Sequence, residues 1–368
     1  MKRSKKSQND RKKVLVAMSG GVDSSVAALL LKKSGYEVIG VTMCFGIEDA
    51  VSGNRPNCCS KSGIEDAKRV AEQLGVPHYT LSFGKLLDKK VIDIFIKEYL
   101  SGRTPNPCVL CNQYLKFGAL FKKAKELNCD YLATGHYAKI GQDKEGNSFL
   151  KTAKDVYKDQ SYFLYRMPKE IMVNILFPLG KLTKEEVRKI ARKDKIRVAD
   201  KRGSQEICFI PRNDYKEFIK NRINKNDIKP GTIRDLEGNV LGEHKGIAFY
   251  TIGQRQGLGI AYKFALYVLK IDKKSNSIIV GKKEDVFGDE LIAKDSHFIV
   301  FGRLPKKLEV EAKIRYNHPK AKATVHILEN NKLRVVFKKP QWAITPGQAV
   351  VFYKKDTVIG GATIERVL

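Results

Sequence analysis

The sequence predicts an α/β domain with a doubly wound parallel sheet, followed by a small β-rich central domain and a C-terminal β-barrel. Two observations support this prediction. From Lys13 to about Ala133, short apolar segments alternate with helical ones, which is the pattern of a parallel sheet covered by helices. After about Asn213, short β-branched or alternating segments are separated by turn residues, as in small barrels.

Each element of the α/β part follows from a local pattern. Short apolar runs predict strands, and apolar residues at helical spacing predict helices. Thr183 and Glu186 have the capping-box spacing at the start of an amphipathic helix, and residues 135–154 read as a hairpin. The strands are expected at residues 14–18, 38–43, 78–82 and 130–134, and the helices at 26–31, 64–74, 86–100, 115–127 and 183–195.

The rest of the chain is expected to be rich in strands. The change from alternating strands and helices to short strands and turns sets the domain boundaries. The strands are predicted at residues 266–271, 277–281, 308–314, 323–328, 333–337 and 349–353. The chain then divides into a basic arm (1–12), an α/β domain (13–212), a small central domain (213–284) and a barrel (285–368).

The charge of the chain favours a polyanionic partner. There are 69 Lys and Arg against 40 Asp and Glu, a formal charge of +29 over 368 residues. Such an excess destabilises a compact protein unless a polyanion shares it, so nucleic acid is the expected partner. A lysine-rich coding bias is the plainer alternative and would explain part of the excess.

The chain lacks the sequence signals of export or membrane insertion. No apolar run is long enough to span a bilayer, and the lysine-rich residues 2–6 lack the apolar core of a signal peptide. We therefore expect a disordered basic arm at the start, no membrane partner and a cytoplasmic location. Structural disulfides are not expected there. All seven cysteines lie before Phe209, which places any sulfur chemistry in the first part of the chain.

The turn after the first predicted strand, residues 19–25 (Ser-Gly-Gly-Val-Asp-Ser-Ser), can hold a polyphosphate. Gly20 and Gly21 allow the backbone to approach an oxyanion, and the following helix directs N–H groups and its positive dipole end to the same point. Ser24 is expected to cap that helix, and Asp23 to hold Mg²⁺ against the phosphates.

Other interpretations of this turn fit less well. A strand–turn–helix junction with Gly and Ser is common in any α/β protein. A nucleophile elbow requires Gly-x-Ser-x-Gly, but Ala17 occupies the first glycine position. A Walker loop requires a Gly-Lys-Ser/Thr ending, which the chain lacks. The segment resembles the pyrophosphate loop of enzymes that cleave ATP between the α and β phosphates to adenylate a substrate.

Two further segments carry candidate sulfur chemistry. Residues 102–112 contain two prolines and a glycine, which predict a rigid loop, and Cys108 and Cys111 have C-x-x-C spacing. Such a pair can bind a metal, form a redox disulfide or shift the pKa of one thiol. Cys208 lies between Ile207 and Phe209, where a buried small apolar residue is the plainer interpretation.

Several motifs in order make the chain similar to the tRNA-specific 2-thiouridylase family, from about Lys13 to the end. They are the loop at Ser19, residues 134–137 (Thr-Gly-His-Tyr), 158–164 (Lys-Asp-Gln-Ser-Tyr-Phe-Leu), 253–259 (Gly-Gln-Arg-Gln-Gly-Leu-Gly) and 346–348 (Pro-Gly-Gln). The resemblance implies a pyrophosphate-loop catalytic domain that adenylates the C2 oxygen of the wobble uridine. Sulfur from a protein persulfide then replaces that oxygen and AMP leaves.

The resemblance implies the roles of the catalytic residues. Cys208 matches the cysteine that carries the persulfide, and Cys111 matches the nucleophile that closes a transient disulfide with it. Asp23 belongs to the ATP site, with Mg²⁺ as the expected metal. A sulfur-donor protein, either a persulfide carrier or a cysteine desulfurase, is the implied partner beside tRNA. The nucleotide contacts implied are Ala17, Met18, Ser19, Gly20, Gly21, Val22, Asp23, Ser24, Met43 and Gly135.

The resemblance also implies two groups of tRNA contacts. One group belongs to the loop that touches the target base. The other contacts the rest of the tRNA. The first comprises Asn106, Pro107 and Cys108; the second comprises His136, Lys158, Asp159, Gln160, Arg315, Tyr316 and Gln348.

Cys108 departs from the pattern of much of the family, which has Asp at this position. Three thiolates, from Cys108, Cys111 and Cys208, would suit three irons of a [4Fe-4S] cluster whose fourth iron binds sulfide. We therefore hypothesise an iron–sulfur route in place of, or beside, the persulfide route. A zinc site that adds Cys58 and Cys59 is a weaker alternative, because adjacent cysteines chelate one metal poorly.

Two other classes of function compete with tRNA thiolation. A small-molecule adenylating ligase such as argininosuccinate synthase shares the ATP chemistry but needs neither the cysteine pair nor the barrel nor the large charge. A basic RNA-binding module without catalysis would be expected to lose Asp23 or Cys111, and both are present.

Overall fold

The computed structural model describes residues 11–46, 61–201, 203, 207–300 and 305–368. Most of the predicted basic arm, Cys58 and Cys59 lie outside these residues. The chain forms two compact units, which we describe separately. The first comprises residues 1–90, 108–213 and 356–358, and the second comprises residues 91–107, 214–355 and 359–368.

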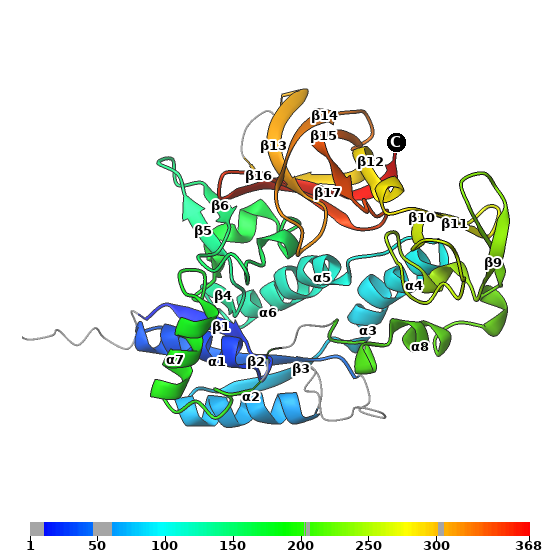
Figure 1. The fold of residues 1–368 in the computed structure, drawn as a ribbon. Coiled ribbons are helices and arrows are strands. Elements are labelled where there is room, and N and C mark those ends of the chain that lie inside the picture. Colours follow the sequence, from blue (N-terminus) through cyan, green and yellow to red (C-terminus); the bar gives the residue numbers. More distant parts are fainter. Residues whose placement is uncertain (1–10, 47–60, 202, 204–206, 301–304) are drawn as a thin grey trace, which may run out of the picture. The chain divides into compact units, whose positions relative to one another are not determined.

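A five-stranded parallel sheet organises the first unit. Its order is β3-β2-β1-β4-β7, and each neighbouring pair is parallel. The chain builds outward from β1 through β2 to β3 and then returns to the other side of β1 as β4, so the topological switch lies between β1 and β4 (Figure 1). The strands are β1 Lys13–Ala17, β2 Glu37–Cys44, β3 His78–Ser82, β4 Tyr131–Thr134 and β7 Ile175–Leu176.

Both faces of this sheet are buried, as a doubly wound fold requires. Val14 and Val16 of β1 have no exposed surface and pack with Val26 and Val187 from two helices. Leu15, which alternation directs to the opposite face, is also completely buried. The helices whose apolar residues join the first face are α1 Val22–Lys33, α2 Lys61–Leu74 and α7 Lys184–Lys193.

Two long helical runs follow β3, each interrupted by π-helical geometry. They are α3 Gly84–Leu87, η2 Asp88–Ile92 and α4 Asp93–Leu100, then α5 Pro107–Leu110, η3 Cys111–Leu120 and α6 Phe121–Glu126. The predicted hairpin is confirmed as β5 Lys139–Gln142 and β6 Ser148–Lys151, and short turns η4 Ser161–Phe163 and η5 Lys169–Asn174 follow it. The predicted capping box at Thr183 and Glu186 is also confirmed.

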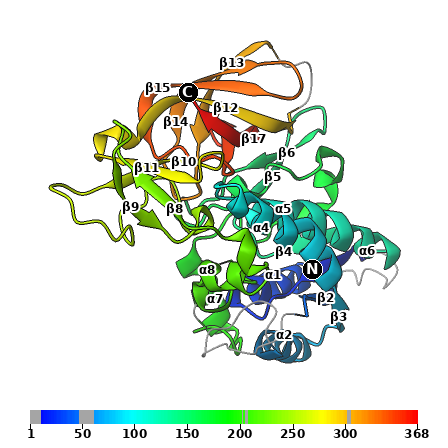
Figure 2. The same ribbon diagram turned by 90° about the vertical axis from the view of Figure 1, so that its right-hand side faces the viewer.

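The second unit contains a small mixed sheet in the order β10-β11-β8-β9 (Figure 2). Its core includes Ile233, Val268 and Ile278, none of which has exposed surface. The elements of this part are α8 Tyr215–Lys220, η7 Lys225–Asp227, β8 Gly231–Arg234, β9 Val240–His244, η8 Ile247–Phe249, β10 Tyr267–Asp272, β11 Ser277–Gly281 and η9 Glu284–Val286.

Six antiparallel strands close into the C-terminal barrel. They run in the order β12-β15-β14-β13-β16-β17, and the pairing of β12 with β17 closes the ring. Inward residues such as Leu291, Val325 and Phe352 are completely buried. The strands are β12 Phe287–Phe298, β13 Lys307–Lys313, β14 Ala321–Ile327, β15 Leu333–Trp342, β16 Ala349–Lys354 and β17 Thr357–Val367.

The structure confirms the predicted fold class and corrects one loop. Residues 107–112 were expected in a rigid loop, but the helix begins at Pro107, so Cys108 and Cys111 are helical. Proline is tolerated at the first helical position because the N–H that it lacks would have no intrahelical acceptor there. Among the described residues, no helix is long and apolar enough to cross a membrane.

Candidate active site

The turn between β1 and α1 has a backbone that only glycine can supply. Gly20 has a φ of +70°, and a Cβ there would lie 2.1 Å from the carbonyl oxygen of Gly63. Gly21 is the N-cap of α1, and no side chain caps the helix at that residue. The N–H groups of the first turn of α1 are therefore directed towards the end of the sheet where an oxyanion would bind.

Hydroxyl groups stabilise this turn from within. The Oγ atoms of Ser24 and Ser25 donate to the carbonyl oxygen of Gly21, at 3.2 and 2.9 Å. The N–H of Ser19 donates to the Oγ of Ser24 at 3.1 Å. The expectation that Ser24 caps α1 is wrong, because the helix begins at Val22 and Ser24 already lies in its first turn.

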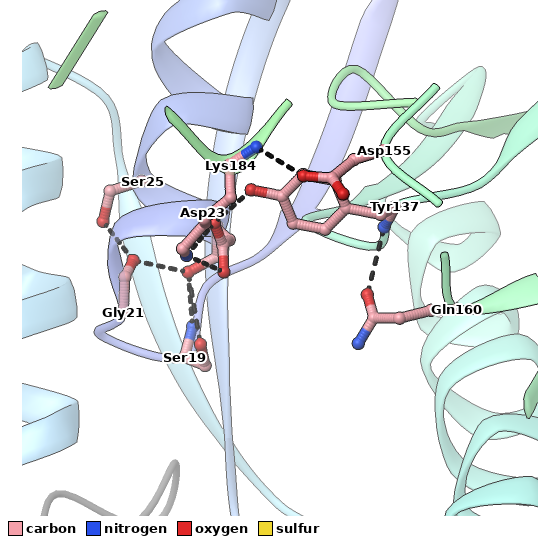
Figure 3. A network of polar contacts seen from close by, with 9 residues as sticks. Ser19, Gly21, Asp23, Ser25, Tyr137, Asp155, Gln160 and Lys184 are labelled. Carbon is pink, nitrogen blue, oxygen red and sulfur yellow. Dashed lines mark hydrogen bonds and ion pairs between the residues drawn. The ribbon is translucent and has the colours of Figure 1, made fainter. Parts of the chain in front are cut away.

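Asp23 is the centre of a charged network at the same helix start (Figure 3). The Nζ of Lys184 donates to both carboxylate oxygens of Asp23, at 2.6 and 2.7 Å, and the hydroxyl of Tyr137 donates to Oδ1 at 2.8 Å. Burial, and then the adjacent Asp23 carboxylate, raise the pKa of Tyr137, so its hydroxyl remains a donor. The Asp23 side chain is 32% exposed, which leaves it accessible to a ligand.

The end of β4 packs closely against this turn. Gly135 follows β4, and a Cβ there would lie 2.7 Å from the backbone nitrogen of Ser24. Met43, near the end of β2, is partly exposed, whereas Met18 is 2% exposed. Among the predicted nucleotide residues, Met18 therefore offers its backbone and Met43 can offer its side chain.

Two further lysines lie at this site, and no sequence motif predicts them there. Lys184 is 161 residues from Asp23 in the chain. Lys201 donates to the carbonyl oxygen of Gly20 at 3.0 Å and to a carboxylate oxygen of Asp66 at 2.6 Å, and its side chain is only 18% exposed. The capping box could have pointed to Lys184, because it fixes that residue as the first of α7.

The cysteines occupy two different settings. Cys108 is the second residue of α5 and Cys111 is the first residue of η3, so both lie in the helical run formed by α5, η3 and α6. Cys208 lies in a turn before the buried Phe209 and Ile210, but is itself partly exposed. All three cysteines are accessible enough for a reagent to reach part of their surface.

The described residues do not fit a metal cluster. Among them, no three His, Cys, Asp or Glu side chains gather closely enough to hold a metal ion. The three cysteines of the iron–sulfur hypothesis belong to that searched set, whereas Cys58 and Cys59 of the zinc alternative lie outside it. We therefore derive no step through a cluster.

Comparison with known proteins identifies the family. Residues 12–212 match the tRNA methyl transferase HUP domain, residues 216–282 the tRNA methyl transferase PRC-barrel domain, and residues 288–364 the aminomethyltransferase β-barrel domain. A relative from Caldanaerobacter subterraneus named tRNA-specific 2-thiouridylase MnmA 1 is 52% identical over 357 residues, 96% of this chain and 98% of the relative. The chain belongs to the tRNA-specific 2-thiouridylase family.

Other members of the 2-thiouridylase family match equally completely. The relative from Carboxydothermus hydrogenoformans is 50% identical over 361 residues, covering 97% of this chain and 99% of its own length. That from Moorella thermoacetica is 51% identical over 355 residues, covering 96% and 99%. The domain descriptions mention methyl transfer, but each of these full-length relatives is named tRNA-specific 2-thiouridylase MnmA.

In this member of the 2-thiouridylase family, the residues expected to contact tRNA differ in exposure. His136 is 8% exposed, and both ring nitrogens have protein partners: Thr134 Oγ1 at 2.7 Å and Lys116 Nζ at 3.3 Å. Because the Lys116 ammonium can only donate, Nε2 accepts and Nδ1 carries the proton. Burial, and then Lys116, hold the pKa of His136 well below its ordinary value.

The segment 158–160 is built around an internal carboxylate. Asp159 is 7% exposed and accepts from the N–H of Ala153 at 3.0 Å and from the hydroxyl of Ser161 at 2.8 Å. The Oε1 of Gln160 accepts from the N–H of Tyr137 at 3.0 Å. Lys158 is partly exposed, so it is the member of the three best able to meet a phosphate.

In the second unit, Gln348 and Arg315 donate to backbone carbonyl groups. Gln348 donates to the carbonyl oxygens of Thr104 and Pro105, at 3.0 and 3.2 Å. Arg315 donates to the carbonyl oxygens of Trp342 and Ala343, at 2.6 and 2.8 Å. Their described contacts thus stabilise a loop and the barrel; their roles towards tRNA remain predictions. Of the others predicted in this unit, Pro107 is buried, whereas Asn106 and Tyr316 are partly exposed.

Proposed function

We propose that the chain is an ATP-dependent tRNA-uridine 2-sulfurtransferase that acts on the wobble uridine. The observation that carries this proposal is the phosphate-binding turn before α1, with Asp23 in its first turn, in a chain whose full-length relatives are named tRNA-specific 2-thiouridylase. The charge of +29 supports a nucleic-acid substrate. A small-molecule adenylating ligase is the alternative, and it does not explain that charge.

The chemistry requires activation before sulfur transfer. The C2 oxygen of uracil is a poor leaving group, so it first attacks the α-phosphorus of ATP, and the bond to pyrophosphate breaks. The terminal sulfur of a Cys208 persulfide then attacks C2, and the C2–oxygen bond breaks to release AMP. The Cys111 thiolate attacks the Cys208 sulfur, which forms a disulfide and leaves the terminal sulfur on C2 as 2-thiouridine. A dithiol reductant must reduce that disulfide before the next cycle.

The residues of the turn have distinct tasks in the first step. The N–H groups at the start of α1 bind the phosphates, while Met43 and Gly135 border the adenosine. Asp23 would hold Mg²⁺, which usually takes one or two carboxylates together with substrate phosphates. When bound, that ion neutralises phosphate charge and eases departure of pyrophosphate.

The two cysteine settings support a persulfide route. The attacking form of Cys111 is its thiolate, and this cysteine is partly exposed at the first residue of η3. Cys208 is partly exposed, so a sulfur-donor protein, either a persulfide carrier or a cysteine desulfurase, can reach it. Because the described residues do not gather into a metal site, we propose this route in place of an iron–sulfur cluster.

The target uridine must leave its stack to be reached. We propose that Asn106, Pro107 and Cys108 form one wall of its pocket. Lys158 would supply a phosphate contact, whereas the buried His136 and Asp159 would keep the neighbouring backbone in place. The protein would act in the cytosol.

The test is incubation with MgATP, a protein persulfide and unmodified tRNA, followed by mass spectrometry of the nucleosides. We expect one AMP and one pyrophosphate for each 2-thiouridine formed. AMP release that requires a small molecule and ignores tRNA would favour the ligase alternative. Iron analysis after anaerobic purification is the companion measurement, and we expect a colourless, active protein.

A further inference from the structure

Lys184 is a second cation at the phosphate turn, and the steps described above do not use it. Its ammonium bonds both oxygens of Asp23, and its side chain is only 18% exposed (Figure 3). It also lies 6.0 Å from the centre of the Tyr137 ring, within the range of a cation–π contact. A flexible surface lysine would not be held by so many groups.

The backbone beneath this lysine is firmly fixed. Lys184 is the first residue of α7, and its N–H donates to Oδ2 of Asp155 at 2.9 Å. Thr183 caps the helix with Glu186 in a complete capping box. One turn further on, Val187 is completely buried in the core that also contains α1. The side chain can therefore pivot, while its point of attachment stays beside the phosphate turn.

The contact with Asp23 conflicts with the metal role proposed for that carboxylate. An ammonium that engages both oxygens leaves little room for Mg²⁺, and two cations on one half-buried carboxylate repel each other. If the carboxylate binds the metal of MgATP, the ammonium needs a new anion. The triphosphate at the start of α1 is the anion that the proposed reaction brings to this point.

We infer that Lys184 is a further substrate-positioning residue of the adenylation step: its ammonium exchanges the Asp23 carboxylate for the triphosphate when MgATP binds. This inference rests on the proposed function, because it takes Asp23 as the metal-binding carboxylate. Lys184 then weakens the binding of a metal ion without nucleotide, because the ammonium and the metal compete for the Asp23 carboxylate. It strengthens the binding of MgATP, because the ammonium contacts the triphosphate. A lysine that merely joins α7 to α1 would have neither property.

The exchange predicts that one substitution strengthens the binding of a metal ion alone and weakens the binding of a metal–nucleotide complex. Lys184→Met keeps the length of the side chain and removes the charge. We expect Mn²⁺ alone, titrated by electron paramagnetic resonance, to bind about tenfold more tightly to this variant, because a charge-assisted contact no longer competes for Asp23. We expect Mg²⁺ with α,β-methylene ATP to bind about tenfold more weakly, because a charge-assisted contact to phosphate is lost.

Two variants control for structural effects. Lys189→Met removes a lysine of the same helix that pairs with Glu185 at 2.8 Å and is 71% exposed, so neither affinity should change. Lys184→Arg retains the charge, and we expect it to restore most of the nucleotide affinity. Thermal unfolding of each variant establishes that α7 is intact.

The outcomes separate this inference from the proposed function. Lower affinity of Lys184→Met for both Mn²⁺ and the nucleotide, or no change in either, would overturn the exchange and leave 2-thiouridine formation untouched. Opposite shifts in a protein that makes no 2-thiouridine would support the exchange and contradict the function.

Discussion

Two helix starts in the first 110 residues carry the candidate chemistry, and they differ in instructive ways. In α1 the second residue is Asp23, and two glycines precede the helix; in α5 the second residue is Cys108, and it follows Asn106 and Pro107. Glycine lets an external anion approach the backbone, whereas proline fixes φ and has no N–H to donate to an anion. One helix start thus offers its N–H groups to a ligand's phosphates, whereas the other carries the cysteines whose thiolate is the reactive group.

The largest effect should come from the thiolate side of this comparison. Cys111→Ser removes the nucleophile that releases sulfur from Cys208, so we expect 2-thiouridine formation to fall by at least about 10³-fold. Nucleoside mass spectrometry measures the product, and filter binding measures tRNA affinity, which should not change. Loss of tRNA binding in this variant would mean that Cys111 is structural.

The glycine side is tested by Gly20→Ala, with Gly35→Ala as its matched control. Both glycines have positive φ, +70° and +88°, but a Cβ at Gly35 meets nothing within 4 Å. We expect each variant to lose about 1–3 kcal/mol of stability from backbone strain, and Gly20→Ala to lose more because its Cβ meets the carbonyl oxygen of Gly63. Only Gly20→Ala should also lose ATP binding. Urea unfolding and nucleotide titration measure the two effects. Equal nucleotide affinity in the two variants would contradict the proposed role of the turn.

The buried His136 predicts a stability that depends on pH. Its pKa is lowered in the folded state, so below the ordinary value the unfolded chain takes up a proton and the folded chain does not. The contribution of His136 to stability is therefore complete above about pH 6.5 and is lost on acidification at up to about 1.4 kcal/mol per pH unit.

Urea unfolding between pH 7.5 and 5.5 measures this slope, and His136→Gln should make it shallower. Part of the slope should persist, because burial also lowers the pKa of His78, His244 and His318. An unchanged slope in His136→Gln would show that His136 is protonated or exposed in solution.

The smallest effect concerns the neutral donor beside Asp23. Tyr137→Phe removes a single hydroxyl bond to the carboxylate, so we expect a loss of about 1 kcal/mol, or about fivefold in kcat/KM for ATP. Steady-state pyrophosphate release measures it. If the loss exceeded that of Lys184→Met, the hydroxyl would be the more important partner of Asp23.

Local patterns predicted much of this structure, and long-range contacts did not. Thr183 and Glu186 are three residues apart, so their capping box could be read directly, as could the glycines of the phosphate turn. The bond between Lys184 and Asp23 joins residues 161 positions apart, and no periodicity reports such a pair.

Two of the wrong or missing secondary-structure predictions involve proline and glycine. The prolines of residues 102–112 predict a loop, but Pro107 is the first residue of a helix. The strand β17 was not predicted, because Gly360 and Gly361 interrupt its apolar pattern; pairing with β12 overrides that local preference.

The hydrogen bonds from Gln348 to Thr104 and Pro105 affect how truncation experiments must be interpreted. Arg103 adds two bonds to the carbonyl oxygens of Ile364 and Glu365, at 3.1 and 3.0 Å, and the N–H of Thr104 donates to Pro346 at 2.9 Å. A chain cut before the barrel would release all of these tethers at once. If such a truncated protein were inactive, the cause could be the lost hydrogen bonds to Thr104 and Pro105. The inactivity would therefore not show that the barrel binds RNA.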